Sequence, residues 1–210
     1  MPTIRTEAVV VGQTPKALGL NLKWSKTAEK SIKNIIARYP ATQSRSALIP
    51  VLHLAQREFD GWLSVDAMQL VADTLELPYI RVYEVATFYT MFNLVPVGKY
   101  HIQVCTNCAC LIGGSDAVMK TIEEETGLKN GDTDVKNLFT ITEVECLGAC
   151  VAAPMMQVTS THGSHYLTHL TAEKTKEILS HLKKGKNPAD LADTPPAPDV
   201  DPITNNKYGA

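Results

Sequence analysis

The five cysteines of this chain all lie between positions 105 and 150, in two tight groups. The first group reads CTNCAC and the second CLGAC. Taking the outer cysteines of each group gives a C-x₄-C pair, Cys105 and Cys110, and a C-x₃-C pair, Cys146 and Cys150. Iron accepts soft thiolate donors, and a [2Fe–2S] cluster needs four of them, two on each iron. The spacing therefore predicts a one-electron carrier with a [2Fe–2S] cluster on these four cysteines.

Two other thiol chemistries are compatible with the same residues. The inner pair Cys105 and Cys108 forms a C-x₂-C motif, which together with Cys146 and Cys150 could hold a structural zinc ion. Alternatively, a C-x₂-C motif that follows a strand is typical of thiol–disulfide exchange, although this interpretation leaves the second pair unexplained. Buried, unreactive cysteines fit poorly with two such tight pairs.

Other polar residues near the cysteines are weaker candidates. Four histidines belong to this region: His101, His162, His165 and His169. Because four cysteines already complete a site, we expect these histidines to be surface or hydrogen-bonding residues. Glu143 and Glu145 precede the second pair, and negative charge there would lower the reduction potential of a cluster. The chain has no G-x-G-x-x-G motif, so we expect NADH and flavin to bind elsewhere and assign no catalytic residue.

The elements that would position the cysteines lie in the second half of the chain. Alternating apolar residues predict a strand over 100–105 that leads into the first cysteines. The remaining predicted elements are a helix at Ser115–Thr126, a strand at Leu138–Cys146, a hairpin of Met155–Val158 and Tyr166–Leu170, and a helix at Ala172–Lys184. The order β-α-β-β-β-α describes an α/β domain of thioredoxin-like type.

The first half predicts helices only. Apolar residues recur at helical spacing over 24–39, 46–59, 65–75 and 80–92, with Ser25 and Ser64 as caps of the first and third helices. Four short helices with brief connections predict a small helical bundle. The resulting domains are an N-terminal arm (1–23), the helical bundle (24–95), the thioredoxin-like domain (96–186) and a flexible tail rich in proline and aspartate (187–210).

Composition sets broad limits on function. The chain has 210 residues, of which 44% are hydrophobic and 20% charged, and a formal net charge of −2. This balance is typical of a soluble globular protein, and the lack of a basic block argues against nucleic-acid partners. No apolar run reaches the roughly 18–20 residues that span a bilayer. The N-terminus resembles neither a secretory signal nor a convincing mitochondrial presequence.

Longer motifs identify a family resemblance. The stretches SALIPVLHLAQ (46–56), GWLSVDAM (61–68), EVATFYTMFNLVPVGKYHIQVC (84–105) and EVECLGACVAAPMMQV (143–158) resemble the ferredoxin-like subunit in the peripheral arm of respiratory NADH:ubiquinone oxidoreductase, complex I. The resemblance covers about residues 24–185. It implies an N-terminal helical bundle followed by a thioredoxin-like [2Fe–2S] ferredoxin domain, and it places the cluster ligands at Cys105, Cys110, Cys146 and Cys150.

The resemblance also implies partners and a location. The chain would be a subunit of NADH:ubiquinone reductase, not catalytic alone, beside the flavoprotein subunit that binds NADH and FMN and near a neighbouring iron–sulfur subunit. Its cluster would exchange electrons with the FMN, as a side store off the main iron–sulfur chain. We expect a peripheral position on the matrix side of the mitochondrial inner membrane, or alternatively on the cytoplasmic face of a bacterial one. Equivalent subunits of soluble NAD-linked hydrogenases or formate dehydrogenases are an alternative, and a zinc-braced structural module is a remote one.

One residue departs from the family pattern. The family often has threonines and a proline between the first two ligands, whereas this chain has Cys108 there. We expect Cys108 to be a non-ligand that fills a small position. The competing hypothesis is that Cys108 replaces Cys105 or Cys110 when either is lost.

Overall fold

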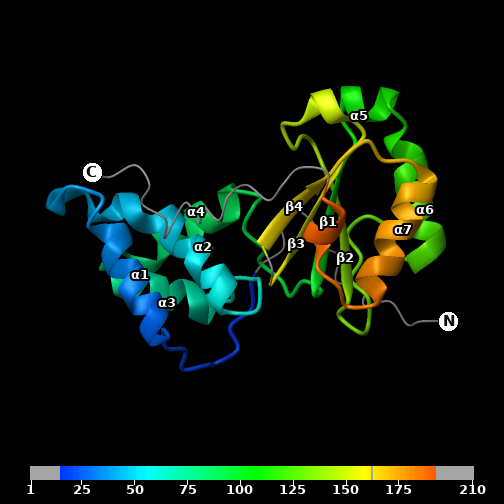
Figure 1. The fold of residues 1–210 in the computed structure, drawn as a ribbon. Helices are drawn as coiled ribbons and strands as arrows, with labels where there is room; N and C mark the ends of the chain where they lie inside the picture. Colours follow the sequence, from blue (N-terminus) through cyan, green and yellow to red (C-terminus); the bar gives the residue numbers. More distant parts are fainter. Residues whose placement is uncertain (1–14, 162, 193–210) are drawn as a thin grey trace. The chain divides into compact units, whose positions relative to one another are not determined.

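The computed structural model describes residues 15–161 and 163–192, which divide into two compact units. We call residues 15–96 the helical unit and residues 97–192 the sheet unit, and describe each by itself (Figure 1). Within the described residues, no helix is both long enough and apolar enough to cross a membrane. The predicted N-terminal arm up to residue 14, His162 in the predicted hairpin turn, and the predicted tail from residue 193 lie outside the described residues.

The helices of the helical unit share one apolar core. Its elements are α1 (Lys26–Ile36), the 3₁₀-helix η1 (Ala41–Ala47), α2 (Leu48–Glu58), α3 (Val65–Leu75) and α4 (Tyr79–Phe88). The hydroxyls of Ser25 and Ser64 accept the N–H groups of Ala28 and Ala67, as predicted for the caps of α1 and α3. The core contains buried residues of all four α-helices, including Ile35, Leu52, Met68 and Val82.

The fourth helix is shorter than the 80–92 range predicted for it. It ends at Phe88 because Tyr89 adopts an extended backbone conformation. This break puts two aromatic residues of the predicted range in different environments. Phe92 is buried against His53, with ring centroids 4.9 Å apart, whereas Phe88 is 76% exposed. The helical period alone could not separate these residues, since both fit one face of a continuous helix.

The sheet unit is built on a four-stranded mixed sheet in the order β2-β1-β3-β4. Its elements are β1 (Tyr100–Cys105), α5 (Cys108–Ile112), α6 (Ser115–Thr126), β2 (Phe139–Val144), the 3₁₀-helix η2 (Cys150–Ala152), β3 (Met156–Ser160), β4 (Gly163–Leu167), α7 (Ala172–Lys183) and the 3₁₀-helix η3 (Pro188–Leu191). Strand β1 pairs with β2 in parallel, whereas β3 is antiparallel to both β1 and β4. The predicted order of elements is therefore present, with α5 and two 3₁₀-helices in addition.

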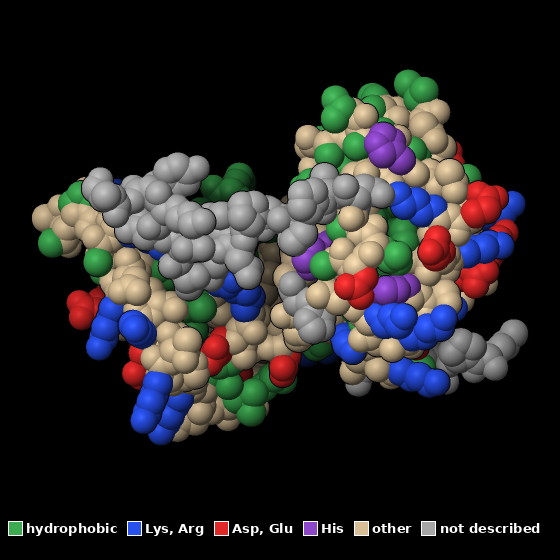
Figure 2. Space-filling view, in the orientation of Figure 1, with side chains coloured by type: hydrophobic (Ala, Val, Ile, Leu, Met, Phe, Trp, Pro, Cys, Tyr) green, Lys and Arg blue, Asp and Glu red, His purple; other side chains and the backbone are tan. Residues whose placement is uncertain are grey.

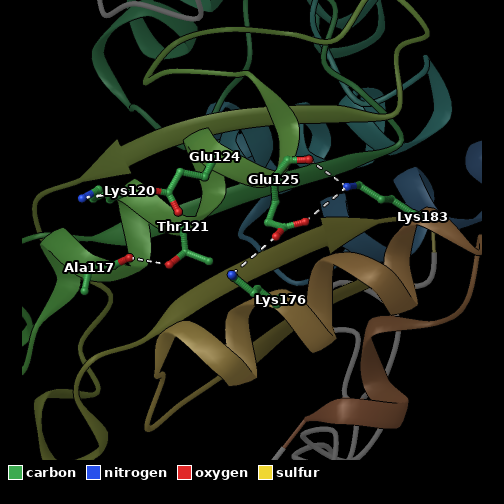
Figure 3. A network of polar contacts seen from close by, with 7 residues as sticks. All are labelled: Ala117, Lys120, Thr121, Glu124, Glu125, Lys176 and Lys183. Atoms are coloured by element: carbon green, nitrogen blue, oxygen red, sulfur yellow. Dashed lines mark hydrogen bonds and ion pairs between the residues drawn. The ribbon is translucent and has the colours of Figure 1, made fainter.

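Helices α6 and α7 lie side by side over one face of the sheet (Figure 1). Apolar residues of β1, such as Ile102, pack there against Ile122 of α6 and Ile178 of α7. A polar network joins the two helices at the surface (Figure 3): the Glu125 carboxylate lies 3.7 Å from the Lys176 ammonium, and Lys183 donates to the Glu125 carbonyl oxygen at 2.8 Å. Partly exposed ion pairs of this kind contribute little free energy, so apolar packing provides most of the stabilisation between α6 and α7.

Residues 187–192, which belong to the predicted tail, include the 3₁₀-helix η3. The Asn187 side chain accepts the Ala189 N–H and starts η3, and Leu191 packs against the core of the sheet unit. His181 of α7 lies 3.0 Å from the Asn187 carbonyl oxygen. The proline-rich composition of this segment did not predict the packing of Leu191 against the core.

Gly98 fixes the entry of the chain into β1. A Cβ atom at this position would lie 2.7 Å from the carbonyl carbon of Phe139, closer than real Cβ contacts come. The Gly98 N–H donates to the Thr140 hydroxyl at 2.7 Å. The backbone of residue 98 therefore lies directly against β2, which only glycine permits.

His101 on β1 is buried and contacts the Thr142 hydroxyl at 2.9 Å, so it has the hydrogen-bonding role among the two that we expected, surface or hydrogen-bonding. Burial lowers the pKa of His101 to about 4. Between that value and the ordinary pKa of about 6.5, the unfolded chain binds a proton that the folded chain does not. Lowering the pH through this window should therefore destabilise the sheet unit, by up to roughly 3 kcal/mol.

This pH dependence can be measured by hydrogen exchange of the β1 amides at pH values between 7 and 4. Their protection should fall more steeply with acidification in the wild-type chain than in the His101→Gln variant, whose amide can still reach Thr142 but does not titrate. Equal pH dependence in both chains would show that His101 protonation does not limit stability.

Candidate functional site

The two cysteine groups meet at one edge of the sheet. Because β1 and β2 are parallel, their carboxyl ends lie at the same edge, with Cys105 in register with Val144. The Thr106 N–H donates to the Val144 carbonyl at 3.3 Å, which extends the pairing by one residue. Strand β3 runs the opposite way and begins at this edge, where the Met155 carbonyl accepts the Cys105 N–H at 3.2 Å. The loops after β1 and β2 and before β3 therefore converge.

The first cysteine loop forms a short helix that the sequence pattern did not predict. The Asn107 side chain accepts the N–H of Cys108 at 2.7 Å and starts α5, which contains both Cys108 and Cys110. Cys108 is exposed, whereas Cys110 is only 2% exposed. Gly113 ends α5 in contact with the second loop, because a Cβ there would lie 3.1 Å from Cδ of Pro154. The helix thus turns one of its two cysteines inward.

The second cysteine loop is held by contacts from several sides. Within the loop, the Gly148 N–H donates to the Cys146 Sγ at 3.3 Å, and Gly148 has a positive φ of 75°. From β4, the Tyr166 hydroxyl donates to the Leu147 carbonyl at 2.8 Å. Beyond the loop, the His169 N–H donates to the Ala152 carbonyl, which closes the segment around η2. Cys146 and Cys150 themselves are exposed.

The cysteines at this edge differ in their surroundings. Cys105, which is 3% exposed, and Cys110 form a small buried cluster with Met155. Burial raises the pKa of the Cys110 thiol, and a hydrogen bond with Cys105 raises it further, whereas the Met155 N–H lowers it. The Cys150 thiol raises the pKa of Cys110 as well. Of the predicted ligands, the structure brings Cys105 and Cys110 together in one buried cluster. Cys146 and Cys150 lie in the second loop, where the Glu145 carbonyl faces the Cys105 Sγ at 3.9 Å.

The remaining candidates stay outside this cluster of thiols. His169 is exposed, with a positive φ of 48°, and His165 is half-buried on β4. Glu143 lies on β2, where its N–H donates to the Asn130 side chain, and Glu145 is exposed. In the part of the chain that the structure describes, all five cysteines are free of disulfides, and no three Cys, His, Asp or Glu side chains form a group that could hold a single metal ion. A two-iron cluster takes only two thiolates on each iron.

Exposed apolar residues adjoin the cysteines in the sequence. Leu111 and Ile112 at the end of α5 and Val151 after Cys150 are among the exposed large hydrophobic residues, with Val151 99% exposed. Figure 2 shows hydrophobic side chains gathered over the α5 end of the sheet unit. The thiol edge is thus bordered by an apolar rim, which we define as Leu111, Ile112 and Val151.

Comparisons with known proteins agree with this architecture. The family model described as thioredoxin-like [2Fe–2S] ferredoxin matches residues 32–183. A subunit of the NADH-quinone oxidoreductase of Rickettsia bellii is 48% identical over 163 residues, covering 78% of this chain and 95% of that protein. The corresponding subunit from Rickettsia prowazekii is 53% identical over 155 residues, covering 74% of this chain and 86% of that protein.

A solved structure shares the fold. The crystal structure of an NAD⁺-reducing [NiFe]-hydrogenase in the air-oxidised state superposes with a TM-score of 0.57 at 17% identity. The match covers 67% of this chain and 23% of that chain. At this identity the likeness concerns the fold alone.

The burial pattern predicts an order of thiol reactivity. In the reduced, metal-free chain, Cys108, Cys146 and Cys150 should react with N-ethylmaleimide before Cys105 and Cys110, because the last two are buried and the pKa of Cys110 is raised. We expect a rate difference of roughly tenfold or more. Mass spectrometry of peptides after timed labelling measures it, with the urea-unfolded chain as the control that should label evenly. Equal rates in the folded chain would contradict the burial of Cys105 and Cys110.

Proposed function

Because this chain belongs to the thioredoxin-like [2Fe–2S] ferredoxin family, we propose that it is the electron-carrying subunit of an NADH:quinone oxidoreductase. It contains one [2Fe–2S] cluster, and when bound this group supplies one-electron transfer. The observation that carries the proposal is the convergence of two cysteine loops at one sheet edge, in a chain about 50% identical to bacterial subunits of that enzyme. We propose four ligands: Cys105, Cys110, Cys146 and Cys150.

The chemistry at the sheet edge fits this group. Four thiols come from two loops, two from each, which matches the two thiolates that each iron requires. The Gly148 N–H donates to the Cys146 sulfur at 3.3 Å, and a backbone hydrogen bond with Met155 lowers the pKa of Cys110. Such donors stabilise thiolates and help set the reduction potential.

The position of Cys108 supports the outer pair over the inner one. Residues two apart on a helix point about 200° apart, so Cys108 and Cys110 cannot both face the site from α5. Cys110 is the buried one, next to Cys105, and Cys108 is exposed. We therefore take Cys108 as a non-ligand, and the family match makes a zinc site on the inner C-x₂-C motif unnecessary.

The exposed side of the site suggests where electrons enter and leave. Cys146 and Cys150 are exposed, and the apolar rim lies beside them. Apolar surface that surrounds an exposed redox site is typical of a protein interface. We propose that this side contacts the flavoprotein subunit, which would bind NADH and FMN, and that this chain passes electrons to and from that FMN without oxidising NADH itself.

The remaining assignments are proposals of the same kind. We propose that the helical unit is a bundle that supplies contact surface, including towards the neighbouring iron–sulfur subunit, and that the proline-rich tail (187–210) serves in docking. The relatives named above are bacterial, which favours a peripheral position on the cytoplasmic face of a bacterial inner membrane over the mitochondrial matrix side. A subunit of a soluble hydrogenase is less favoured, because that likeness is limited to the fold.

The ligand assignment predicts opposite results for neighbouring cysteines. The wild-type chain and Cys108→Ser should both contain about two irons and two acid-labile sulfides and give the same EPR spectrum after reduction. Cys110→Ser should lose the cluster, because α5 cannot turn Cys108 inward without unwinding. A normal cluster in Cys110→Ser would instead show that Cys108 can replace it, and loss of the cluster in Cys108→Ser would make Cys108 a ligand.

The proposed electron partner can be tested with NADH. NADH alone should leave the cluster of this chain oxidised, and addition of an FMN-loaded flavoprotein subunit should allow NADH to reduce it, as seen by EPR at low temperature. The same flavoprotein without FMN is the control. Reduction by NADH in the absence of flavoprotein would refute the assignment of NADH oxidation to the partner.

A further inference from the structure

We propose that Tyr166 is a positioning residue that orients the second cysteine loop and, through one peptide group, aims a hydrogen bond at the Cys146 sulfur. The inference rests on the proposed assignment of Cys146 as a cluster ligand. It assigns a role in tuning the cluster to a residue on the outer strand of the sheet, 20 positions after that ligand.

Tyr166 projects away from the apolar core of the sheet unit. On β4 its neighbour Leu167 is buried in the core beneath α6 and α7, and successive residues of a strand point to opposite faces. The Tyr166 side chain is therefore on the other face, and the residue is 36% exposed. The phenol ring does not pack in the apolar core. Its hydroxyl instead donates to the Leu147 carbonyl, 2.8 Å away, and this contact needs an explanation.

That carbonyl belongs to the same peptide group as the Gly148 N–H. A trans peptide is planar, and its C=O and N–H bonds point in opposite directions. When Tyr166 holds the Leu147 oxygen towards β4, the Gly148 N–H must therefore point the other way. It points at the Cys146 Sγ, 3.3 Å from the Gly148 nitrogen. The hydroxyl, the peptide group and the sulfur thus form a continuous relay of two hydrogen bonds.

The Tyr166 hydrogen bond restrains the centre of the second cysteine loop. Gly148 has a φ of 75°, and a Cβ atom built there would have no neighbour within 4 Å, so no side-chain packing at this position restrains the peptide plane. The contacts on either side involve Glu145, whose carbonyl faces the Cys105 sulfur, and Ala152, whose carbonyl accepts the His169 N–H. The Tyr166 hydroxyl acts on the segment between them, where a glycine peptide could otherwise rotate.

The relay should stabilise the reduced cluster. Reduction adds negative charge to the thiolate sulfurs, so an N–H donor at Cys146 favours the reduced state and raises the potential. A donor to the Leu147 oxygen polarises the peptide and strengthens its N–H as a donor. Removing the Tyr166 hydroxyl should therefore lower the reduction potential. A hydrogen bond contributes a factor of roughly two- to tenfold in an equilibrium, and tenfold corresponds to about 59 mV for one electron.

The test compares Tyr166→Phe with Tyr100→Phe in the full-length, cluster-containing chain. Tyr100 is a matched control, because its hydroxyl also donates to a backbone carbonyl, that of Lys186, at 2.9 Å, but it lies at the opposite end of β1 from Cys105. EPR-monitored titration with dithionite, which transfers one electron to the oxidised cluster without making or breaking a bond in the protein, gives the potential. ENDOR spectroscopy of the reduced chain in D₂O reports the exchangeable N–H proton near the sulfur.

In Tyr166→Phe we expect full iron content, a ratio of reduced to oxidised cluster roughly two- to tenfold lower at fixed potential, and a weaker exchangeable-proton coupling. Tyr100→Phe should match the wild type in all three measurements. Wild-type potential and coupling in Tyr166→Phe would overturn the inference. If Tyr166→Phe folds but does not retain a cluster, Tyr166→His decides the question: a cluster regained through its ring N–H supports positioning, and continued loss overturns it.

These outcomes are distinct from failure of the proposed function. A wild-type chain without iron, or a Cys146→Ala chain with an unchanged cluster, would refute the ligand assignment itself. An unchanged reduction potential in a Tyr166→Phe chain with a full cluster content would refute only the proposed relay.

Discussion

Parallel pairing between β1 and β2 is the constraint on which the site depends. The register that sets Cys105 opposite Val144 brings together two loops that are separated by 35 residues of sequence. A slip of one residue would turn the alternating side chains of β2 to the wrong faces and shift the second loop along the sheet. Ile141 in the apolar core and Thr140, bound by the Gly98 N–H, both oppose such a slip. The cysteine spacing within each loop matters only once this register is fixed.

The site is asymmetric, with one cysteine pair buried and the other exposed. Cys105 at the end of β1 and Cys110 in α5 are buried next to Met155. The second loop contributes Cys146 and Cys150 at the surface, beside the apolar rim. If each group of cysteines holds one iron, as we propose, one iron would have buried thiolate ligands and the other exposed ones. Added negative charge is better solvated on an exposed side, so this asymmetry would favour reduction of the exposed iron.

Local patterns in the sequence predicted the helices and strands well, whereas they could not predict contacts between residues far apart in the sequence. The caps at Ser25 and Ser64 follow from short-range hydrogen bonding, and β1 follows from its alternation. Helix α5 was missed because five residues do not show a helical period, although Asn107 before Cys108 is a recognisable start signal. The burial of His101 depends on partners that only the folded sheet brings near. No signal in the sequence connects Tyr166 with Leu147.

Convergence of the two loops also has a consequence for chain entropy. A cluster held at both Cys110 and Cys146 is a covalent bridge across 35 intervening residues, and it restricts the unfolded chain much as a disulfide does. For a closed loop of this length the corresponding stabilisation is about 4 kcal/mol. The bridge encloses α6 and all of β2, whose pairing with β1 sets the register of the site. The bound cofactor and the sheet that positions its ligands therefore reinforce each other thermodynamically.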